Sequence, residues 1–251
     1  MIHITDSQDP RIAEFISIRD HVLNAKNLIV AESEKIYLQY KASGRTIYKI
    51  LATPTFIERH KLSGETIFSA EKNVLEAVAG FKVQFEVLFL AERPTDTPLN
   101  ELDDRIILLN GLTSAENVGS IVRSAAAFGI KSMLVDEKTC SPYLRRCIRV
   151  SMGNIFSIKT YHSLNIRGDL KKLREDGYSI LSTANIPGSI DMNTFSFPQN
   201  CVLIIGSEGH GIDQDIINNS DTVLKIKIDP QVAHLNAANA AAIFLSRMSS
   251  L

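Results

Sequence analysis

Short apolar runs, each followed by polar or glycine residues and then by a helical pattern, constrain the fold of this chain most. Three such runs span residues 106–109, 202–205 and 223–228. Apolar strands that alternate with helices are typical of a mostly parallel sheet covered by helices on both faces. The second part of the chain therefore predicts an α/β fold of this kind.

The same alternation continues through the rest of this part. Strands are predicted at residues 105–109, 132–135, 157–159, 179–182, 201–205 and 223–228. Helices are predicted at residues 118–128, 142–150, 170–175, 213–218 and 235–248.

A polar stretch with two prolines, Pro94 and Pro98, divides the chain near residue 100. We therefore expect a small α/β domain over residues 1–95, a linker over 96–104 and a larger domain over 105–251. The first domain is expected to begin with a helix over 11–23. Four strands (28–31, 48–52, 66–68, 85–90) and three helices (34–42, 56–62, 72–78) follow it.

Bulk properties describe an ordinary globular protein. Hydrophobic residues make up 45% of the chain and the mean hydropathy is +0.03. No apolar stretch reaches the roughly 20 residues that a membrane-spanning helix needs, and the first residues lack the pattern of a signal peptide. The three cysteines, Cys140, Cys147 and Cys201, show no metal-site spacing. These features predict a reduced, cytoplasmic setting and no metal.

The charge is nearly balanced overall but unevenly distributed. A net charge of −1 argues against indiscriminate coating of nucleic acid. Residues 138–174, however, hold nine basic residues and a single acid, Asp169. Guanidinium groups match phosphate geometry, so Arg145, Arg146 and Arg149 are predicted to bind RNA.

Three segments place polar or glycine residues where a strand ends and a helix begins. They contain Asn117, Gly119 and Arg123, then a glycine-rich loop over 206–211, then residues 234–236. Because ligands bind at the carboxyl ends of parallel strands, these segments are expected to form one composite site. The dinucleotide-binding glycine pattern and a Walker A lysine are both missing here, which counts against a nicotinamide enzyme and a nucleoside triphosphatase.

Taken in order, these segments resemble the three motifs of the SpoU (TrmH-like) RNA 2′-O-ribose methyltransferases of the SPOUT superfamily. The resemblance covers residues from about 105 to 249, and residues 145–153 also match a segment between the first two motifs. Residues 1–95 resemble, less closely, the small substrate-binding domain that often precedes the catalytic domain in this family.

The resemblance implies a C-terminal trefoil knot, a homodimer with its sites near the subunit boundary, and RNA (rRNA or tRNA) as the partner. It implies S-adenosylmethionine as the cofactor, bound in a bent form by the knotted loops. The residues that it assigns to cofactor binding are Thr183, Gly206, Gly211, Ile226 and Leu235.

The resemblance also assigns catalytic roles to Arg123, Asn117, Glu208, His234 and Asn236. A guanidinium is a poor base, so we expect Arg123 to polarise the 2′-oxygen and to clamp the adjacent phosphate; a surface ion pair with Glu116 is the alternative. Asn117 fits an N-cap of its helix as well as a site residue. Asn236 could cap its helix or form a hydrogen bond to the site loops. The alternative role of Glu208 is to accept hydrogen bonds from backbone N–H groups of its own loop.

Some positions depart from the family pattern. His234 replaces a usual serine, Lys227 a proline and Ile228 a methionine. An imidazole titrates near neutral pH, so His234 is a new catalytic participant, a phosphate ligand or a mark of lost activity. An inactive RNA-binding homologue and a base methyltransferase of the same superfamily are therefore the alternatives to a ribose methyltransferase.

Overall fold

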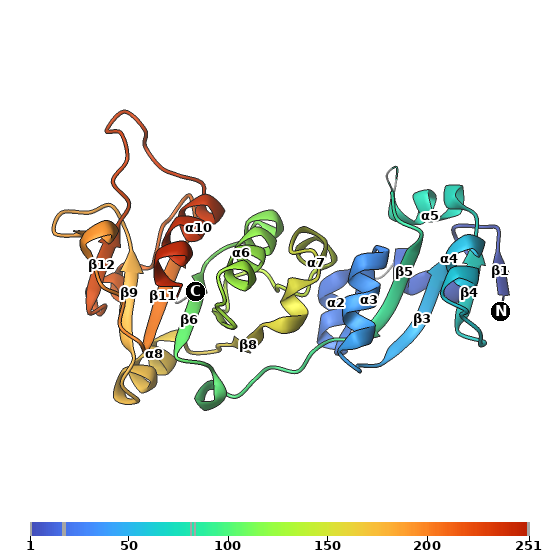
Figure 1. Cartoon of the computed structure of the whole chain (residues 1–251), viewed down its shortest axis with the longest axis horizontal. Helices are drawn as coiled ribbons and strands as arrows, with labels where there is room; N and C mark the ends of the chain where they lie inside the picture. The colour runs from blue at the N-terminus through green and yellow to red at the C-terminus, as the bar shows by residue number, and fades with distance from the viewer. Residues whose placement is uncertain (1, 17–18, 81, 83, 250–251) are drawn as a thin grey trace. The chain divides into compact units, whose positions relative to one another are not determined.

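The computed structural model describes residues 2–16, 19–80, 82 and 84–249. The chain forms two compact units, shown in Figure 1. The first comprises Met1–Pro94 and Tyr143–Phe156, and the second comprises Thr95–Pro142 and Ser157–Leu251. The stretch expected to be a linker thus belongs to the second unit, and a segment from the middle of the chain joins the first.

The first unit is built on a five-stranded sheet in the order β1-β4-β3-β5-β2, in which β5 runs antiparallel to both β3 and β2. The strands are β1 (Ile2–Ile4), β2 (Leu28–Glu32), β3 (Ile47–Ala52), β4 (Ile67–Ala70) and β5 (Val87–Glu92). Its helices are α1 (Ala13–Ile16), α2 (Asp20–Ala25), α3 (Glu34–Ala42), α4 (Pro54–Arg59), α5 (Lys72–Ala79) and α7 (Arg145–Val150), with a 3₁₀ turn at Pro10–Ile12.

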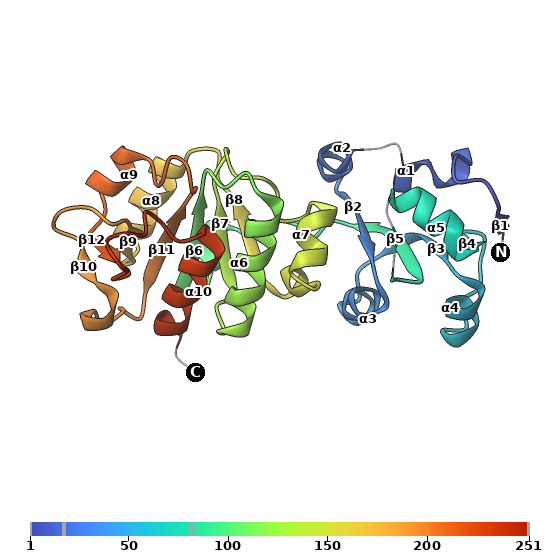
Figure 2. The same cartoon turned by 90° about the horizontal axis from the view of Figure 1, so that it is seen from above.

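Helices cover both faces of this sheet (Figure 2). A mainly aliphatic core that also holds Phe15 and Phe68 lies under α1, α2 and α5. On the side of α3 and α4 aromatic rings pack edge to face, and the ring centres of Tyr37 and Phe56 are 5.4 Å apart. The single helix predicted over 11–23 is wrong. Arg19 has an extended backbone and precedes α2, so α1 and α2 are separate helices.

Helix α7 is anchored to the first unit by a buried carboxylate. Glu32, at the end of β2, has a side chain only 1% exposed. It accepts hydrogen bonds from Arg145 Nε and Arg149 Nη1, both at 2.7 Å. Asp20 on α2 accepts from the backbone N–H of Arg145 at 2.8 Å. Two of the arginines predicted to bind RNA therefore neutralise a buried glutamate.

Second-unit strands form a seven-stranded sheet in the order β10-β12-β9-β11-β6-β7-β8, with every pairing parallel. The strands are β6 (Arg105–Asn110), β7 (Ser132–Val135), β8 (Lys159–His162), β9 (Ser179–Thr183), β10 (Ile190–Asp191), β11 (Cys201–Gly206) and β12 (Thr222–Lys225). The helices are α6 (Ala115–Ala127), α8 (Ile166–Glu175), α9 (Gln214–Asn218) and α10 (Ala237–Met248). Short 3₁₀ turns of this unit lie at Leu99–Glu101 and Met192–Thr194, and another, Asn154–Ser157, lies where the chain passes from the first unit to the second.

Both faces of this parallel sheet are covered, by α6 and α10 on one side and by α8 and α9 on the other (Figure 2). The predicted α/β class with a parallel sheet is confirmed. No described helix is long and apolar enough to span a membrane. The three cysteines are free thiols, and burial raises the pKa of Cys201 to about 11.

Two predicted strands of the second unit are displaced, and in the first unit the strand expected at 85–90 is Val87–Glu92. The strand expected at 157–159 is Lys159–His162, because the 3₁₀ turn at Asn154–Ser157 takes up the preceding residues. The strand expected at 223–228 ends at Lys225, since its pairing with β9 ends at Leu224 and its pairing with β10 ends at Lys225. Residues 226–228 are thereby left to form a loop.

The basic stretch over 138–174 is largely neutralised. At least seven of its nine cations lie within ion-pair distance of a carboxylate: Lys138, Arg145, Arg149, Lys159, Arg167, Lys171 and Arg174. The expected polyanion-binding surface is therefore mostly occupied by acids from elsewhere in the chain, such as Asp213, Asp215 and Asp221.

We expect Glu32→Ala to lower the free energy of unfolding by about 3–5 kcal/mol, because two partly buried guanidinium groups lose their counter-charge. Urea unfolding measures the change. Glu175→Ala is the matched control: its pair with Lys171 is exposed, so the loss should stay below about 1 kcal/mol. Equal losses for the two variants would contradict the anchoring role of Glu32.

Candidate functional site

The carboxyl ends of β9, β11 and β12, which are neighbours in the sheet, open into a cavity of about 430 Å³. We call it the large cavity. Residues after each of these strands line it, together with one side of α10. All five residues expected to bind a cofactor are in its wall: Thr183, Gly206, Gly211, Ile226 and Leu235. Ile226 reaches this position because β12 ends one residue earlier.

A second cavity of about 310 Å³, the small cavity, lies between the loop after β6 and the loop after β11. Residues 111–114 and Asn117 form one wall. Residues 207–210 form the other, and the same four residues also line the large cavity. The two cavities therefore adjoin across a single loop.

Glu208, in that shared loop, joins the three predicted segments. Its Oε1 accepts from Asn117 Nδ2 at 2.5 Å and from Asn236 Nδ2 at 2.6 Å. The backbone N–H of Ala237, the first residue of α10, points to the same oxygen at 3.4 Å. Asn236 also donates to Asn117 Oδ1 at 3.0 Å. Segments about 90 and 28 residues from Glu208 in sequence thus meet at one carboxylate.

The helix caps explain why two asparagines are available to Glu208. Ser114 caps α6 by accepting from the N–H of Asn117, so the alternative role of Asn117 as N-cap is wrong. Its side chain instead points out of the first turn toward Glu208. Asn236 does cap α10, with its Oδ1 accepting from Ala238 and Asn239, while its Nδ2 bonds to Asn117 and Glu208. Both roles proposed for Asn236 therefore coexist.

Two glycines shape the shared loop. Ser207 and Gly211 exchange backbone hydrogen bonds of 3.1 and 2.9 Å, which closes the loop into a tight turn. A Cβ atom on Gly206 would lie 2.3 Å from the carbonyl carbon of Gly211, so no side chain fits there. Gly211 has a φ of +68°, which other residues adopt only with strain.

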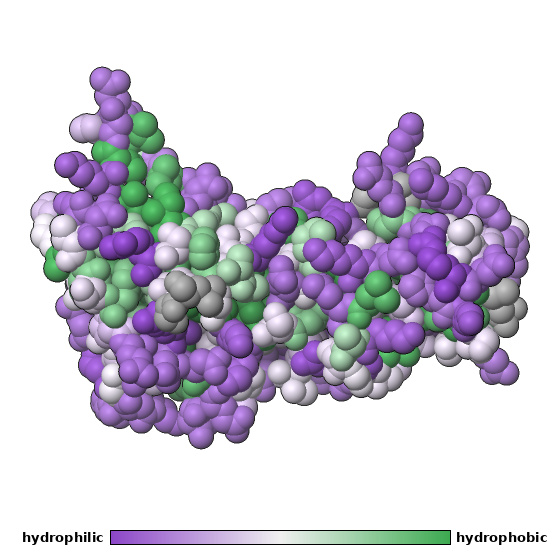
Figure 3. Space-filling model, in the orientation of Figure 1, coloured by the Kyte–Doolittle hydropathy of each residue, from purple (hydrophilic) through white to green (hydrophobic). Residues whose placement is uncertain are grey.

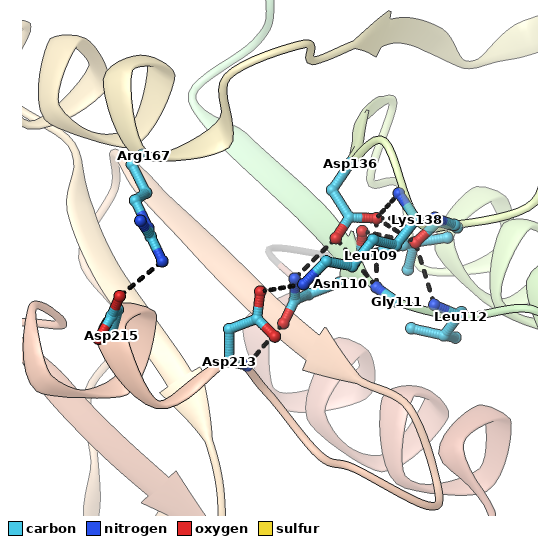
Figure 4. A network of polar contacts seen from close by, with 10 residues as sticks. Leu109, Asn110, Gly111, Leu112, Asp136, Lys138, Arg167, Asp213 and Asp215 are labelled. Carbon is cyan, nitrogen blue, oxygen red and sulfur yellow. Dashed lines mark hydrogen bonds and ion pairs between the residues drawn. The ribbon is translucent and has the colours of Figure 1, made fainter.

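A buried polar network supports these loops from below (Figure 4). Asp136 is 3% exposed and accepts from Asn110 Nδ2 at 2.7 Å and from the N–H of Gly111. Asn110, 1% exposed, accepts through its Oδ1 from the N–H of Asp213 at 2.9 Å. The network ties the loop after β6 to the start of α9. Sequence reasoning missed it, although Asp136 follows an apolar strand in the way that the recognised motifs do.

One ion pair closes this network at the surface. Lys138 Nζ lies 2.8 Å from Asp213 Oδ2. The hydrogen bond from Lys138 lowers the pKa of Asp213, and the same bond raises the pKa of Lys138. Both groups stay charged at neutral pH. Since both side chains are about half exposed, the pair fixes loop geometry more than it stabilises the fold.

Arg123 is not brought to either cavity. It is exposed on α6 and lines neither space. Six residues along a helix correspond to about 9 Å of rise and about 120° of rotation away from Asn117, so the two side chains leave the helix in different directions. Among the described residues, no ion pair is seen between Arg123 and Glu116, the alternative considered from the sequence.

His234 lines the large cavity and is exposed, on the loop between β12 and α10. This loop projects from the unit at the upper left of Figure 1, and Figure 3 shows hydrophobic residues gathered along it. Ile226, Ile228 and Leu235 from this loop face the cavity, as does Phe244 of α10, which sequence reasoning did not identify. The cavity thus combines apolar walls with backbone amides and carbonyls, a composition typical of small-molecule sites.

The remaining predicted residues lie elsewhere. Arg145, Arg146 and Arg149 belong to the first unit and are absent from the lining of both cavities. Within the described ranges, no three His, Cys, Asp or Glu side chains gather as metal ligands do.

Comparisons with known proteins identify the family. The model of the SpoU rRNA Methylase family matches residues 104–246. An uncharacterized tRNA/rRNA methyltransferase of Mycobacterium bovis is 25% identical over 258 residues, covering 96% of this chain and 88% of the relative.

Solved structures share the whole fold. The AdoMet-bound rRNA methyltransferase from Sinorhizobium meliloti has a TM-score of 0.87 at 19% identity, covering 98% of this chain and 96% of that one. The SpoU methyltransferase AviRb from Streptomyces viridochromogenes, in complex with AdoMet, has a TM-score of 0.79 at 22% identity, with 95% of each chain covered.

The two asparagines bound to Glu208 should differ in their effect on stability. Asn236→Ala removes a helix cap and is expected to lower the free energy of unfolding by about 0.5–2 kcal/mol. Asn117→Ala removes no cap and should stay within about 0.5 kcal/mol of the unsubstituted protein. Urea unfolding of both variants checks this order; a larger loss for Asn117→Ala would contradict it.

Proposed function

Because the chain belongs to the SpoU rRNA Methylase family, we propose that it is an S-adenosylmethionine-dependent RNA 2′-O-ribose methyltransferase. One observation supports this most: Glu208 holds the three family motifs together between two adjoining cavities. One cavity suits a cofactor and the other an acceptor nucleotide. We also propose a homodimer and a C-terminal trefoil knot, as the family implies, and a cytoplasmic enzyme that acts on rRNA or tRNA.

The large cavity fits the proposed cofactor. S-adenosylmethionine supplies a methyl group made electrophilic by its sulfonium. Backbone groups at Gly206, Ile226 and Leu235 are placed to hold the adenine and ribose, and Gly206 must lack a side chain for the loop to close. Apolar contacts from Ile228 and Phe244 would exclude water from the bound adenosyl group. Thr183 stabilises the cavity wall, because its hydroxyl donates a hydrogen bond to the carbonyl of Ile204 at 2.8 Å.

The small cavity is proposed to receive the acceptor ribose. A ribose hydroxyl is far too weak an acid to ionise at neutral pH, so a group of the protein or of the RNA must accept its proton. Asn117 and Glu208 are fixed at the boundary of the two cavities and position the acceptor. His234 lines the adjoining large cavity, and in this proposal its imidazole accepts the proton.

Arg123 acts, in this proposal, on the RNA rather than inside a cavity. Its exposed place on α6 leaves the guanidinium available for a phosphate. A phosphate held there would be fixed next to the reacting ribose in a dimer whose sites lie near the subunit boundary. The arginine would then polarise the 2′-oxygen and neutralise charge as the proton leaves.

Incubation with methyl-labelled S-adenosylmethionine and total rRNA and tRNA tests the proposal. We expect label in RNA, and alkaline hydrolysis should release it as a dinucleotide, since a methylated 2′-oxygen blocks cleavage of the adjacent phosphodiester. Label in a mononucleotide would indicate a base methyltransferase. No transfer to either RNA class would contradict the enzymatic proposal.

A second candidate, an inactive RNA-binding homologue, is favoured only by His234, which replaces the usual serine at an exposed point of the cavity wall. Calorimetry separates the two, because an inactive homologue would bind RNA but not S-adenosylmethionine. His234→Ser adds a direct test: a fall in transfer assigns the imidazole a part in the reaction, and unchanged or higher transfer marks it as a tolerated substitution.

Gly206→Ala should weaken S-adenosylmethionine binding by at least about ten-fold, equivalent to about 1.4 kcal/mol. The added methyl group would meet the backbone of Gly211 and displace the shared loop. Gly209→Ala is the control, because a Cβ there has no neighbour within 4 Å. Calorimetric titration measures both; equal affinity for the two variants would contradict the assigned geometry.

Arg123→Ala should lower turnover by about 100-fold or more while leaving S-adenosylmethionine affinity unchanged, because the arginine lies outside the large cavity and acts on the acceptor. Single-turnover experiments measure the rate, and calorimetry measures the affinity for S-adenosylmethionine. Arg167→Ala removes another exposed arginine, from α8, and should keep the full rate. Retention of most of the rate by Arg123→Ala would remove it from the mechanism.

A further inference from the structure

The first compact unit carries a groove of about 430 Å³ between the end of α3, strand β3 and the turn before β4. Three cations and two tyrosines line it: Lys41, Arg45, Lys49, Tyr37 and Tyr48. Its other lining residues are apolar or small and uncharged, and none is acidic. The groove lies in the first unit, whereas the three motifs lie in the second, and the sequence assigned no individual role to its lining residues.

Tyr48 is presented to solvent by an irregularity in the sheet. The β3/β5 register shifts between Ile47 and Lys49, so Tyr48 has no partner on β5. Pairing of β3 with β4 begins only at Ile50. A bulge of this kind redirects a side chain, and Tyr48 is 43% exposed, whereas Tyr37 is buried. A large ring exposed at a sheet irregularity offers a flat face to a ligand.

The cations of the groove differ in availability. Lys49 Nζ is engaged, at 2.6 Å from Glu14 Oε1 and 3.2 Å from the carbonyl of Arg11. Lys41 and Arg45 form no ion pair with a described carboxylate, in contrast to most cations of the 138–174 stretch. Lys41 Nζ lies over the ring of Tyr37, 5.8 Å from its centre, which directs it along the groove.

We propose that this groove binds a single-stranded segment of the RNA substrate, with one base stacked on Tyr48 and the flanking phosphates held by Lys41 and Arg45. The inference rests on the proposed function for its choice of RNA. Proteins that bind single strands combine a basic groove with aromatic faces on which bases stack, and this groove has both. It also gives the first unit an RNA contact in place of Arg145 and Arg149, which neutralise Glu32.

Fluorescence anisotropy of the full chain with a labelled oligouridylate, over a series of salt concentrations, tests the proposal. Tyr48→Ala should raise Kd about ten-fold, and Tyr48→Phe should stay within about two-fold, because the ring and not the hydroxyl makes the contact. The double variant Lys41→Ala/Arg45→Ala should reduce the slope of log K against log salt by about 1.4, or about 0.7 for each lost phosphate contact. Thermal unfolding midpoints confirm that each variant is folded.

Lys26→Ala/Lys72→Ala is the matched control, since it removes two exposed cations from the same unit but outside the groove. The inference is overturned if this pair weakens binding as much as the groove pair does, or if Tyr48→Ala binds like the unsubstituted chain. It is also overturned if a polyglutamate peptide competes as well as unlabelled oligouridylate, which would indicate an acidic protein partner.

Failure of the proposed function is distinguishable from failure of this inference. If the proposed function is wrong, the unsubstituted chain transfers no methyl group to RNA, whether or not it binds the oligouridylate. If only the inference is wrong, binding and transfer both proceed and the groove variants behave like the control pair.

Discussion

The hydrogen bonds to the carboxylate of Glu208 are the interaction on which the site depends. Asn117 on α6, Asn236 and the first N–H of α10 all donate to one oxygen. The starts of α6 and α10 are therefore both held against the loop after β11. A charged acceptor makes stronger hydrogen bonds than a neutral one, and anions are favoured at a helix N-terminus. These bonds thereby hold the exposed loop as the common wall of two cavities.

A carboxylate also holds segments of the first unit together, but it is buried, whereas Glu208 is exposed. Glu32 is buried, and its charge is tolerated only because Arg145 and Arg149 reach it from a segment that the chain supplies after crossing the second unit. Two arginines predicted from the sequence to bind RNA therefore form ion pairs inside the folded protein instead. The proposed RNA contact moves to Lys41, Arg45 and Tyr48. No described carboxylate pairs with these two cations, and a sheet irregularity exposes the aromatic ring.

Sequence reasoning predicted the alternation of strands and helices and the meeting of the three motifs, because apolar runs and glycine or asparagine at strand ends report directly on local structure. It could not predict where β12 ends, since that depends on the extent of its partners β9 and β10. Charge counting along residues 138–174 failed for a related reason: the neutralising acids, such as Glu32 and Asp215, are remote in sequence. The exposure of Arg123 outside both cavities follows from its place on α6: six residues after Asn117, its side chain leaves the helix in a different direction.

The affinity of Glu208→Ala for S-adenosylmethionine, measured by calorimetry, tests the central claim most directly. Loss of the shared acceptor should release the loop over 206–211 from α6 and α10 and weaken binding by about 10- to 100-fold, as expected for hydrogen bonds to a charged group. Glu208→Gln keeps one acceptor oxygen, so its Kd should lie between those of the unsubstituted chain and of Glu208→Ala. An unchanged Kd in a folded Glu208→Ala variant would show that the carboxylate does not organise the cofactor cavity, and would contradict the account.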